Sequence, residues 1–202
     1  MPNPFNNLPA GRQAPFPSIK RVAQRTVAHC GPAVLEMLFS HLGVYVDQDE
    51  FVEATGLKHR LQQFGMTVEE MGVAVYKIYP YFTFWYKEKA EITDIETIIE
   101  EYKYPVGVEW QGVFLEDEDD DNGHYSIVTA VNPARDSIVI ADPYMKFAGV
   151  DRHFTVTEFL DRWWDVNDIS VFGKTVQKRD DRVLFIVTPE EVTWPESLGM
   201  TK

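Results

Sequence analysis

The stretch that decides the fold runs from residue 24 to residue 43 and reads QRTVAHCGPAVLEMLFSHLG. Pro32 stands at an early position of an expected helix, and Gly43 stops that helix. Between them the helix carries an apolar stripe formed by Val34, Leu35, Leu38 and Leu42. Cys30 therefore lies at the N-terminus of the predicted helix.

A cysteine at the head of a helix has two properties that acyl chemistry needs. The attacking species is the thiolate, which a positive field such as a helix N-terminus favours, and the free amides there can donate to a developing oxyanion. Gln24, six residues earlier, is close enough in sequence to add a side-chain amide. The alternative is that Cys30 is a small buried hydrophobe. Catalysis follows only if a histidine and a carboxylate lie beside it.

Five histidines compete for the role of base. His124 is placed best, because it follows a glycine at the start of the apolar segment 125–131, where a strand can hold an imidazole at a sheet edge. His29 adjoins Cys30, but adjacent residues point in different directions. The remaining three lie in or after early helices or in a charged turn, and they are His41, His59 and His153.

Asp142 is the candidate carboxylate, at the end of the next apolar segment, 137–141. The turn-forming residues 132–136 predict a hairpin, so the start of one strand is level with the end of the other. His124 and Asp142 then become neighbours, and the aspartate can fix the tautomer of the imidazole. The alternative is that Asp142 is a turn former before Pro143.

Three further helices are expected. Capping boxes, Thr67 with Glu70 and Thr93 with Glu96, start the first two, at about residues 68–79 and 94–102. The third covers residues 157–164, and we expect it to carry its large apolar side chains inward, namely Phe159, Leu160 and Trp163.

Segments rich in β-branched and aromatic residues predict strands at 105–110, 125–131, 137–141 and 183–188. Helices that precede antiparallel strands, without regular βαβ alternation, predict an α+β fold with a helical N-terminal part packed on an antiparallel sheet. Residues 1–17 are rich in proline and predict an extended arm. Residues 18–202 predict one domain, long enough to bury a core without disulfides or a metal.

Composition excludes several functional classes. A net charge of −13 disfavours nucleic acid as a partner, and a basic peptide or protein is expected instead. The single cysteine permits no internal disulfide and no zinc site of several thiolates. The sequence contains no apolar run of about 18 residues that would span a membrane. It also shows no secretory signal, so a cytoplasmic location is expected.

Six consecutive acidic residues, 116–121, lie shortly before His124. Asp117, Asp119 and Asp121 alternate, as calcium ligands can. Counting from Asp117, however, Asn122 and Val128 occupy the places where an EF-hand needs a glycine and a glutamate. We therefore interpret the run as a charged lip beside the cleft that selects basic substrates.

Three motifs in order carry a family resemblance: Gln24-x5-Cys30-Gly31-Pro32-Ala33, Gly123-His124-Tyr125 and Ala141-Asp142-Pro143. Together they resemble the signature of the double-glycine-leader (bacteriocin-processing) peptidases and their stand-alone relatives in the papain-like superfamily. The resemblance implies a papain-like fold without a cofactor or metal. It also implies four roles: Cys30 as nucleophile, Gln24 as oxyanion-hole donor, His124 as general base and acid, and Asp142 as the residue that orients it. His29 departs from the family, which often has an acidic residue there.

The expected activity is hydrolysis of a peptide or isopeptide bond through a thioester acyl-enzyme. Two alternatives stay open. The same machinery could transfer the acyl group to an amine, and the four site residues do not discriminate between water and an amine as acceptor. A catalytically silent peptidase fold could instead act as a binding module that holds a basic partner on its acidic face.

Overall fold

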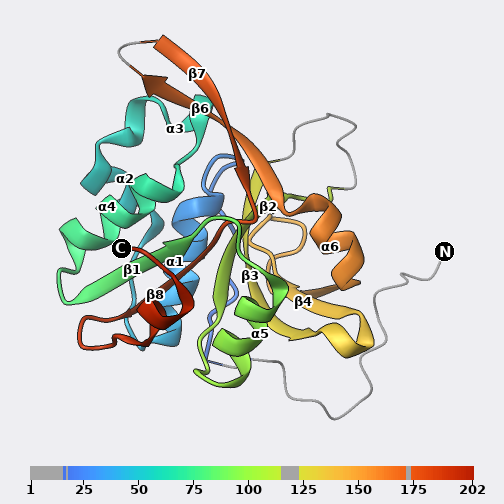
Figure 1. Cartoon of the computed structure of the whole chain (residues 1–202). Helices are drawn as coiled ribbons and strands as arrows, with labels where there is room; N and C mark the ends of the chain where they lie inside the picture. The colour runs from blue at the N-terminus through green and yellow to red at the C-terminus, as the bar shows by residue number, and fades with distance from the viewer. Residues whose placement is uncertain (1–15, 17, 115–122, 172–173) are drawn as a thin grey trace.

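A computed structural model describes residues 16, 18–114, 123–171 and 174–202 (Figure 1). The acidic run 116–121 and, apart from Phe16, the predicted arm 1–17 lie outside the described residues.

A six-stranded sheet forms the centre of the molecule, and its strands follow the order β1-β8-β2-β3-β4-β5. Every hydrogen-bonded pair in this sheet is antiparallel. The strands are β1 (Phe82–Lys87), β2 (Val106–Gln111), β3 (Gly123–Asn132), β4 (Ser137–Ala141), β5 (Asp151–Phe154) and β8 (Leu184–Pro189). The α+β class predicted from the sequence is confirmed.

Helices cover both faces of the sheet (Figure 1). The α-helices are α1 (Cys30–His41), α2 (Gln48–Thr55), α3 (Leu61–Phe64), α4 (Val68–Ile78), α5 (Ile92–Glu100) and α6 (Val156–Arg162). Three short 3-10 helices connect other segments: η1 (Leu57–His59), η2 (Pro133–Arg135) and η3 (Trp194–Leu198). Within the described ranges, no helix is both long enough and apolar enough to cross a membrane.

Two apolar cores lie on the opposite faces of the sheet. One joins α1, α2 and α4 to the sheet, and the other joins α5 and α6 to it. Strand β8 contributes to both, because successive side chains of a strand point to opposite faces. Phe185 and Val187 enter the core of α1, whereas Leu184 and Ile186 enter the core of α5 and α6. The sheet is therefore buried between two helical layers.

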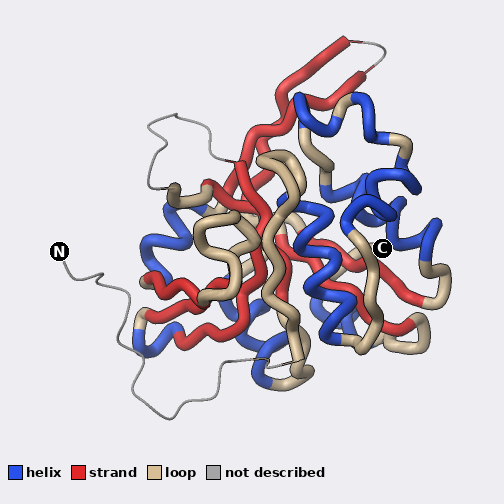
Figure 2. The backbone as a smooth tube through the Cα atoms, turned by 180° about the vertical axis from the view of Figure 1, so that it is seen from behind, coloured by secondary structure: helices blue, strands red, loops and turns tan. Residues whose placement is uncertain are grey.

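A separate two-stranded hairpin, β6 (Trp164–Val171) and β7 (Lys174–Asp181), projects from one end of the sheet, as both views of the backbone show (Figures 1 and 2). The base of this hairpin is anchored, since Trp163 donates its indole N–H to the Val183 carbonyl at 2.9 Å. Strand β6 also packs against β2 and β3. This hairpin was not predicted from the sequence.

Two local predictions about helices are wrong. Helix α5 begins earlier than expected, because its capping box is Glu91 with Asp94 and not Thr93 with Glu96. In the α6 segment Leu160 is 40% exposed, whereas Phe159 and Trp163 are buried. Helix α6 ends at Arg162, and its inner face is formed by Val156 and Phe159, which are spaced three residues apart as one face of a helix requires.

The contact between Gly107 and Phe185 makes a steric prediction. A Cβ added at Gly107 would lie 2.2 Å from Cε2 of the Phe185 ring. We expect Gly107→Ala to lower the free energy of unfolding by about 1–3 kcal/mol through overpacking, measured by urea denaturation. Phe185→Leu in the Gly107→Ala background should recover part of that loss, so strictly additive effects of the two substitutions would contradict the steric explanation.

Candidate active site

Cys30 is the first residue of α1, as the sequence predicts. The first main-chain bond of the helix runs from the Ala33 N–H to the His29 carbonyl at 2.9 Å, and Pro32 has no N–H. The amides of Cys30 and Gly31 therefore precede the hydrogen-bonded part of the helix. Cys30 is 8% exposed and lines a cleft of about 350 Å³. The Cys30 thiol thus lies beside the free amides at the start of α1 and next to an open cleft.

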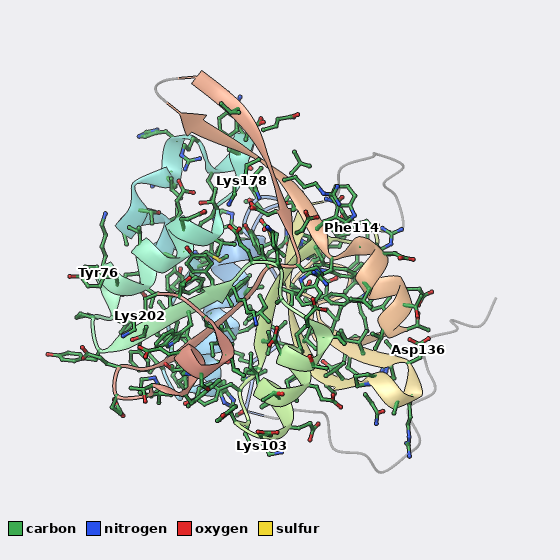
Figure 3. The ribbon with its side chains drawn as sticks, in the orientation of Figure 1. Tyr76, Lys103, Phe114, Asp136, Lys178 and Lys202 are labelled. Carbon is green, nitrogen blue, oxygen red and sulfur yellow. The ribbon has the colours of Figure 1, made fainter. Side chains whose placement is uncertain are left out.

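The β3–β4 hairpin brings His124 and Asp142 together. Ile127 pairs with Ala141 across the two strands, so His124 near the start of β3 lies beside Asp142 just after β4. The imidazole Nε2 lies 2.8 Å from Oδ1 of Asp142, and both residues are almost fully buried. Figure 3 labels Asp136 at the turn of this hairpin and Phe114 near its other end, where the Phe114 ring meets His124 at 5.2 Å between centroids.

Burial and neighbouring charges shift the pKa values of His124 and Asp142 in opposite directions. Burial lowers the pKa of His124, but Asp142 and Cys30 beside it outweigh burial and raise that pKa to about 10. Burial likewise raises the pKa of Asp142, but His124, the Tyr144 amide and Arg152 outweigh it and lower that pKa to about 2. At neutral pH the two residues therefore form an imidazolium–carboxylate pair.

The imidazole also reaches the thiol. Since Asp142 is ionised and can only accept, the His124 Nε2 carries the proton of their hydrogen bond. The other ring nitrogen, Nδ1, is then the one available to Cys30, whose side chain contributes, after Asp142, to the raised pKa of His124. Cys30, His124 and Asp142 thus form one connected array, built from the head of α1, the start of β3 and the end of β4.

Gln24 is buried but does not belong to this array. Its side-chain Nε2 donates to the carbonyls of Thr26 at 2.9 Å and Val27 at 3.0 Å, and the residue is absent from the described lining of the cleft. Its main-chain N–H donates to the Pro143 carbonyl at 2.8 Å. Gln24 therefore ties the loop before Cys30 to the turn after Asp142.

The other histidines lie in other surroundings. His29 hydrogen-bonds Thr26 through Nδ1 at 2.6 Å, and its Nε2 lies 3.6 Å from Asp49. His41 is at the opposite end of α1 from Cys30 and bonds Ser18 at 2.9 Å. The last two are His59, which is exposed in η1, and His153 on β5. Of the five, His124 is the one placed beside the thiol.

Strand β6 closes one side of the cleft. A Cβ at Gly123 would lie 2.5 Å from Oδ1 of Asp165, so the glycine before His124 lets β6 approach the end of β3. The described lining of the cleft is Val27, Ala28, Cys30, Gln62, Gln63, Phe64, Gly65, Gly123, Asp165, Val166, Asn167, Asp168 and Gln177. This wall carries carboxylates and amides, and no Lys or Arg is among these residues.

A buried glutamate lies under this wall. Glu109 accepts a hydrogen bond from the Tyr125 hydroxyl at 2.7 Å and another from the Asn167 amide at 2.9 Å. Burial, with added repulsion from Asp165 and Asp180, outweighs these two donors and raises the pKa of Glu109 to about 8. Glu109 is therefore mostly uncharged at neutral pH, within the network that supports β6.

The residues that surround the His124–Asp142 pair were not predicted from the sequence. Tyr144 donates its amide to Oδ1 of Asp142 at 2.9 Å, and its ring packs on Phe114. Arg152 donates to Oδ2 of Asp142 at 2.6 Å. Tyr144 follows the Asp-Pro motif directly, so that motif was a usable signal, whereas Arg152 lies on β5, a strand that the sequence analysis did not predict.

Comparison with known proteins identifies the family of this chain. Residues 16–171 match the model of a family described as "Peptidase_C39 like family". The chain belongs to this family. The family supports an enzyme of the cysteine peptidase kind, and the sequence resemblance to double-glycine-leader peptidases is confirmed at the level of the family. No curated protein matches the chain significantly.

The fold of this Peptidase_C39-like chain is similar to that of a solved relative. That structure is the peptidase domain of Streptococcus ComA, described as a bi-functional ABC transporter involved in a quorum sensing pathway. The two share 19% identity with a TM-score of 0.60, over 85% of this chain and 98% of the ComA domain. The likeness confirms the predicted papain-like fold.

The raised pKa of Glu109 predicts a pH-dependent stability. The ordinary pKa is 4.5 and the folded value is about 8, so between these values the folded state keeps a proton that the unfolded state has released. Stability conferred by this group therefore falls as pH rises through that window, by up to about 1.4 kcal/mol per pH unit. Glu109→Gln keeps an acceptor for Tyr125 and removes the titration.

As pH rises from about 5 to about 8, we expect Glu109→Gln to gain stability relative to the unmodified protein, measured by urea unfolding across that range. Glu53→Gln, at an exposed position of α2, is the matched control and should follow the unmodified protein. Parallel curves for Glu109→Gln and the unmodified protein would show that Glu109 does not hold the proton.

Proposed function

We propose that this chain is a cysteine peptidase in which Cys30 attacks a peptide or isopeptide carbonyl, His124 transfers protons, and Asp142 orients His124. The observation that carries the proposal is that Cys30 lines an open cleft and lies close enough to the hydrogen-bonded His124–Asp142 pair to raise the pKa of His124. A thiol, an imidazole and a carboxylate in that order are the components of nucleophilic acyl transfer.

Acylation begins when the Cys30 thiolate forms a bond to the carbonyl carbon. The negative charge moves to the carbonyl oxygen, where the amides of Cys30 and Gly31 can donate to it. The raised pKa of His124, about 10, supports an imidazolium at neutral pH. This cation stabilises the thiolate and then gives its proton to the leaving amine as the C–N bond breaks.

Deacylation uses the same imidazole in its neutral form. A water molecule attacks the thioester carbon while His124 takes one proton from it, and the C–S bond breaks to release a carboxylic acid and the thiolate. Gln24 serves as a further oxyanion donor in this proposal, provided that its amide leaves one of the two loop carbonyls it contacts in the structure.

The charge of the cleft supports a basic peptide as substrate. Asp165 and Asp168 lie on the β6 wall, and no Lys or Arg is among the described residues that line the cleft. The whole chain has a net charge of −13. A Lys or Arg side chain near the scissile bond would therefore gain favourable electrostatics, both in approach and in the complex.

Acyl transfer to an amine is the second candidate, because attack on the thioester by an amine would need the same residues as attack by water. A binding module without catalysis is the third. The connection of Cys30 to His124 supports chemistry over binding alone, and amine acceptors supplied with an acyl donor distinguish transfer from hydrolysis by the mass of the product.

The first test removes the nucleophile and the base. Cys30→Ala and His124→Ala should each reduce peptide hydrolysis by at least about 1000-fold, because the steps need both groups. Cleavage of a proteome-derived peptide mixture, followed by mass spectrometry, measures this without a known substrate. The matched control is His59→Ala, at an exposed position of η1, which should keep full activity. Hydrolysis that persists in Cys30→Ala would overturn the proposal.

The second test addresses the preference for basic peptides. Asp168→Asn should reduce the preference for Lys or Arg over Glu near the cleaved bond by about 3- to 10-fold, which corresponds to one partly screened charge pair. The readout is the ratio of kcat/KM values for matched peptides. Asp161→Asn on α6 removes an equal charge outside the cleft lining and should leave the ratio unchanged. Equal ratios in both variants would exclude Asp168 as a determinant.

A further inference from the structure

Arg152 makes an unusually complete set of contacts behind the candidate site. Its Nη1 donates to Oδ2 of Asp142 at 2.6 Å, and its Nη2 donates to the Val113 carbonyl at 2.7 Å. Its side chain is 12% exposed. The guanidinium carbon lies 3.7 Å above the centre of the Phe147 ring and 4.9 Å from that of Phe154. A planar cation held by two hydrogen bonds and two rings has little freedom to move.

These contacts fix the orientation of the carboxylate. Oδ1 of Asp142 accepts from His124 and from the Tyr144 amide, whereas Oδ2 accepts from Arg152. Because both oxygens are engaged by different partners, the carboxylate cannot rotate without breaking several buried hydrogen bonds. The orientation of the imidazole is fixed as well, because its Nε2 donates to Oδ1 of the fixed carboxylate.

The contacts also change the charge that His124 experiences. Ionisable groups come from the elements packed around the imidazole: Cys30 on α1, Glu109 on β2, Asp142 after β4, Arg152 on β5 and Asp165 on β6. Of these, Arg152 is the permanent cation, and it contacts Asp142 directly. Cys30 thiolate, His124 imidazolium, Asp142 carboxylate and Arg152 guanidinium together sum to zero charge.

We propose that Arg152 is a positioning residue of this site, which holds Asp142 toward His124 and offsets its charge so that the imidazolium can release its proton. This inference rests on the proposed function. Without the guanidinium, the full charge of Asp142 would act on His124 and would stabilise the imidazolium. The neutral imidazole that deacylation requires would then form only at higher pH.

A simple acyl donor isolates the step that Arg152 controls. With 4-nitrophenyl acetate, Cys30 displaces 4-nitrophenolate, which leaves without a proton from His124. Hydrolysis of the resulting thioester still needs neutral His124 to take a proton from water. The initial burst of nitrophenolate measures acylation, the slower steady release measures deacylation, and intact-mass spectrometry measures the fraction of acyl-enzyme that persists.

We expect Arg152→Gln to slow deacylation by about tenfold at neutral pH, since a shift of one pH unit in the ascending limb of the pH–rate profile has that effect. The acyl-enzyme should accumulate, and the rate should recover as pH rises. Arg152→Lys keeps the charge but loses the forked geometry, so its pH profile should match that of the unmodified protein, with a lower rate. If Arg152 had a purely structural role, both variants would deacylate more slowly and neither would show a shifted pH profile. That result would overturn the inference.

A double variant tests the charge argument where a single variant fails to fold. Asp142→Asn leaves Arg152 as a buried cation without its carboxylate, whereas Asp142→Asn with Arg152→Gln removes both charges. Because the guanidinium then has no carboxylate charge to offset, we expect the double variant to deacylate no more slowly than Asp142→Asn alone. A double variant that is slower by the product of the two single effects would overturn the inference. If the unmodified protein forms no thioester on Cys30, the proposed function itself fails, and this outcome is distinct from either result above.

Discussion

The hydrogen bond between His124 and Asp142 is the interaction on which the rest of the candidate site depends. It places two ionised groups where both are almost fully buried. Removing such groups from water costs several kcal/mol each unless every charge finds partners. The surrounding residues supply those partners: the Cys30 side chain for the imidazole, and the Tyr144 amide with Arg152 for the carboxylate. Each buried charge of the site is thus offset by a neighbouring group.

Strand register is what allows this bond to form. A slip of one residue between β3 and β4 would turn His124 to the opposite face of the sheet. The register contains an irregularity between Val128 and Ala130, which the two strands accommodate before they reach the turn at Asp136. Gly123 adds a second constraint, because Asp165 occupies the space that any larger side chain would need.

The sequence predicted the features that depend on local patterns. The start of α1 at Cys30, the β3–β4 hairpin and the approach of His124 to Asp142 follow from a proline at an early helix position, a turn and two apolar strands. Arg152 and Glu109 did not follow, because their importance arises from contacts with residues distant in the sequence, such as Val113 and Asn167. Pairing of β1 with β8 is likewise nonlocal. The β6–β7 hairpin is local, but β7 reads KTVQKRDD and shows no apolar alternation that would predict a strand.

The position of β8 in the sheet determines how late in synthesis the sheet can assemble. This strand lies between β1 and β2, and it sends Phe185 into the core that contains α1. During synthesis, β1 and β2 therefore have no shared neighbour until residues 184–189 have left the ribosome. Helix α1 packs directly on β3, which carries His124, but Phe185 of β8 completes the core beneath that helix. A nascent chain without β8 would therefore carry Cys30 on an incompletely packed helical layer. The sheet itself would stay open between β1 and β2 until that late segment is in place.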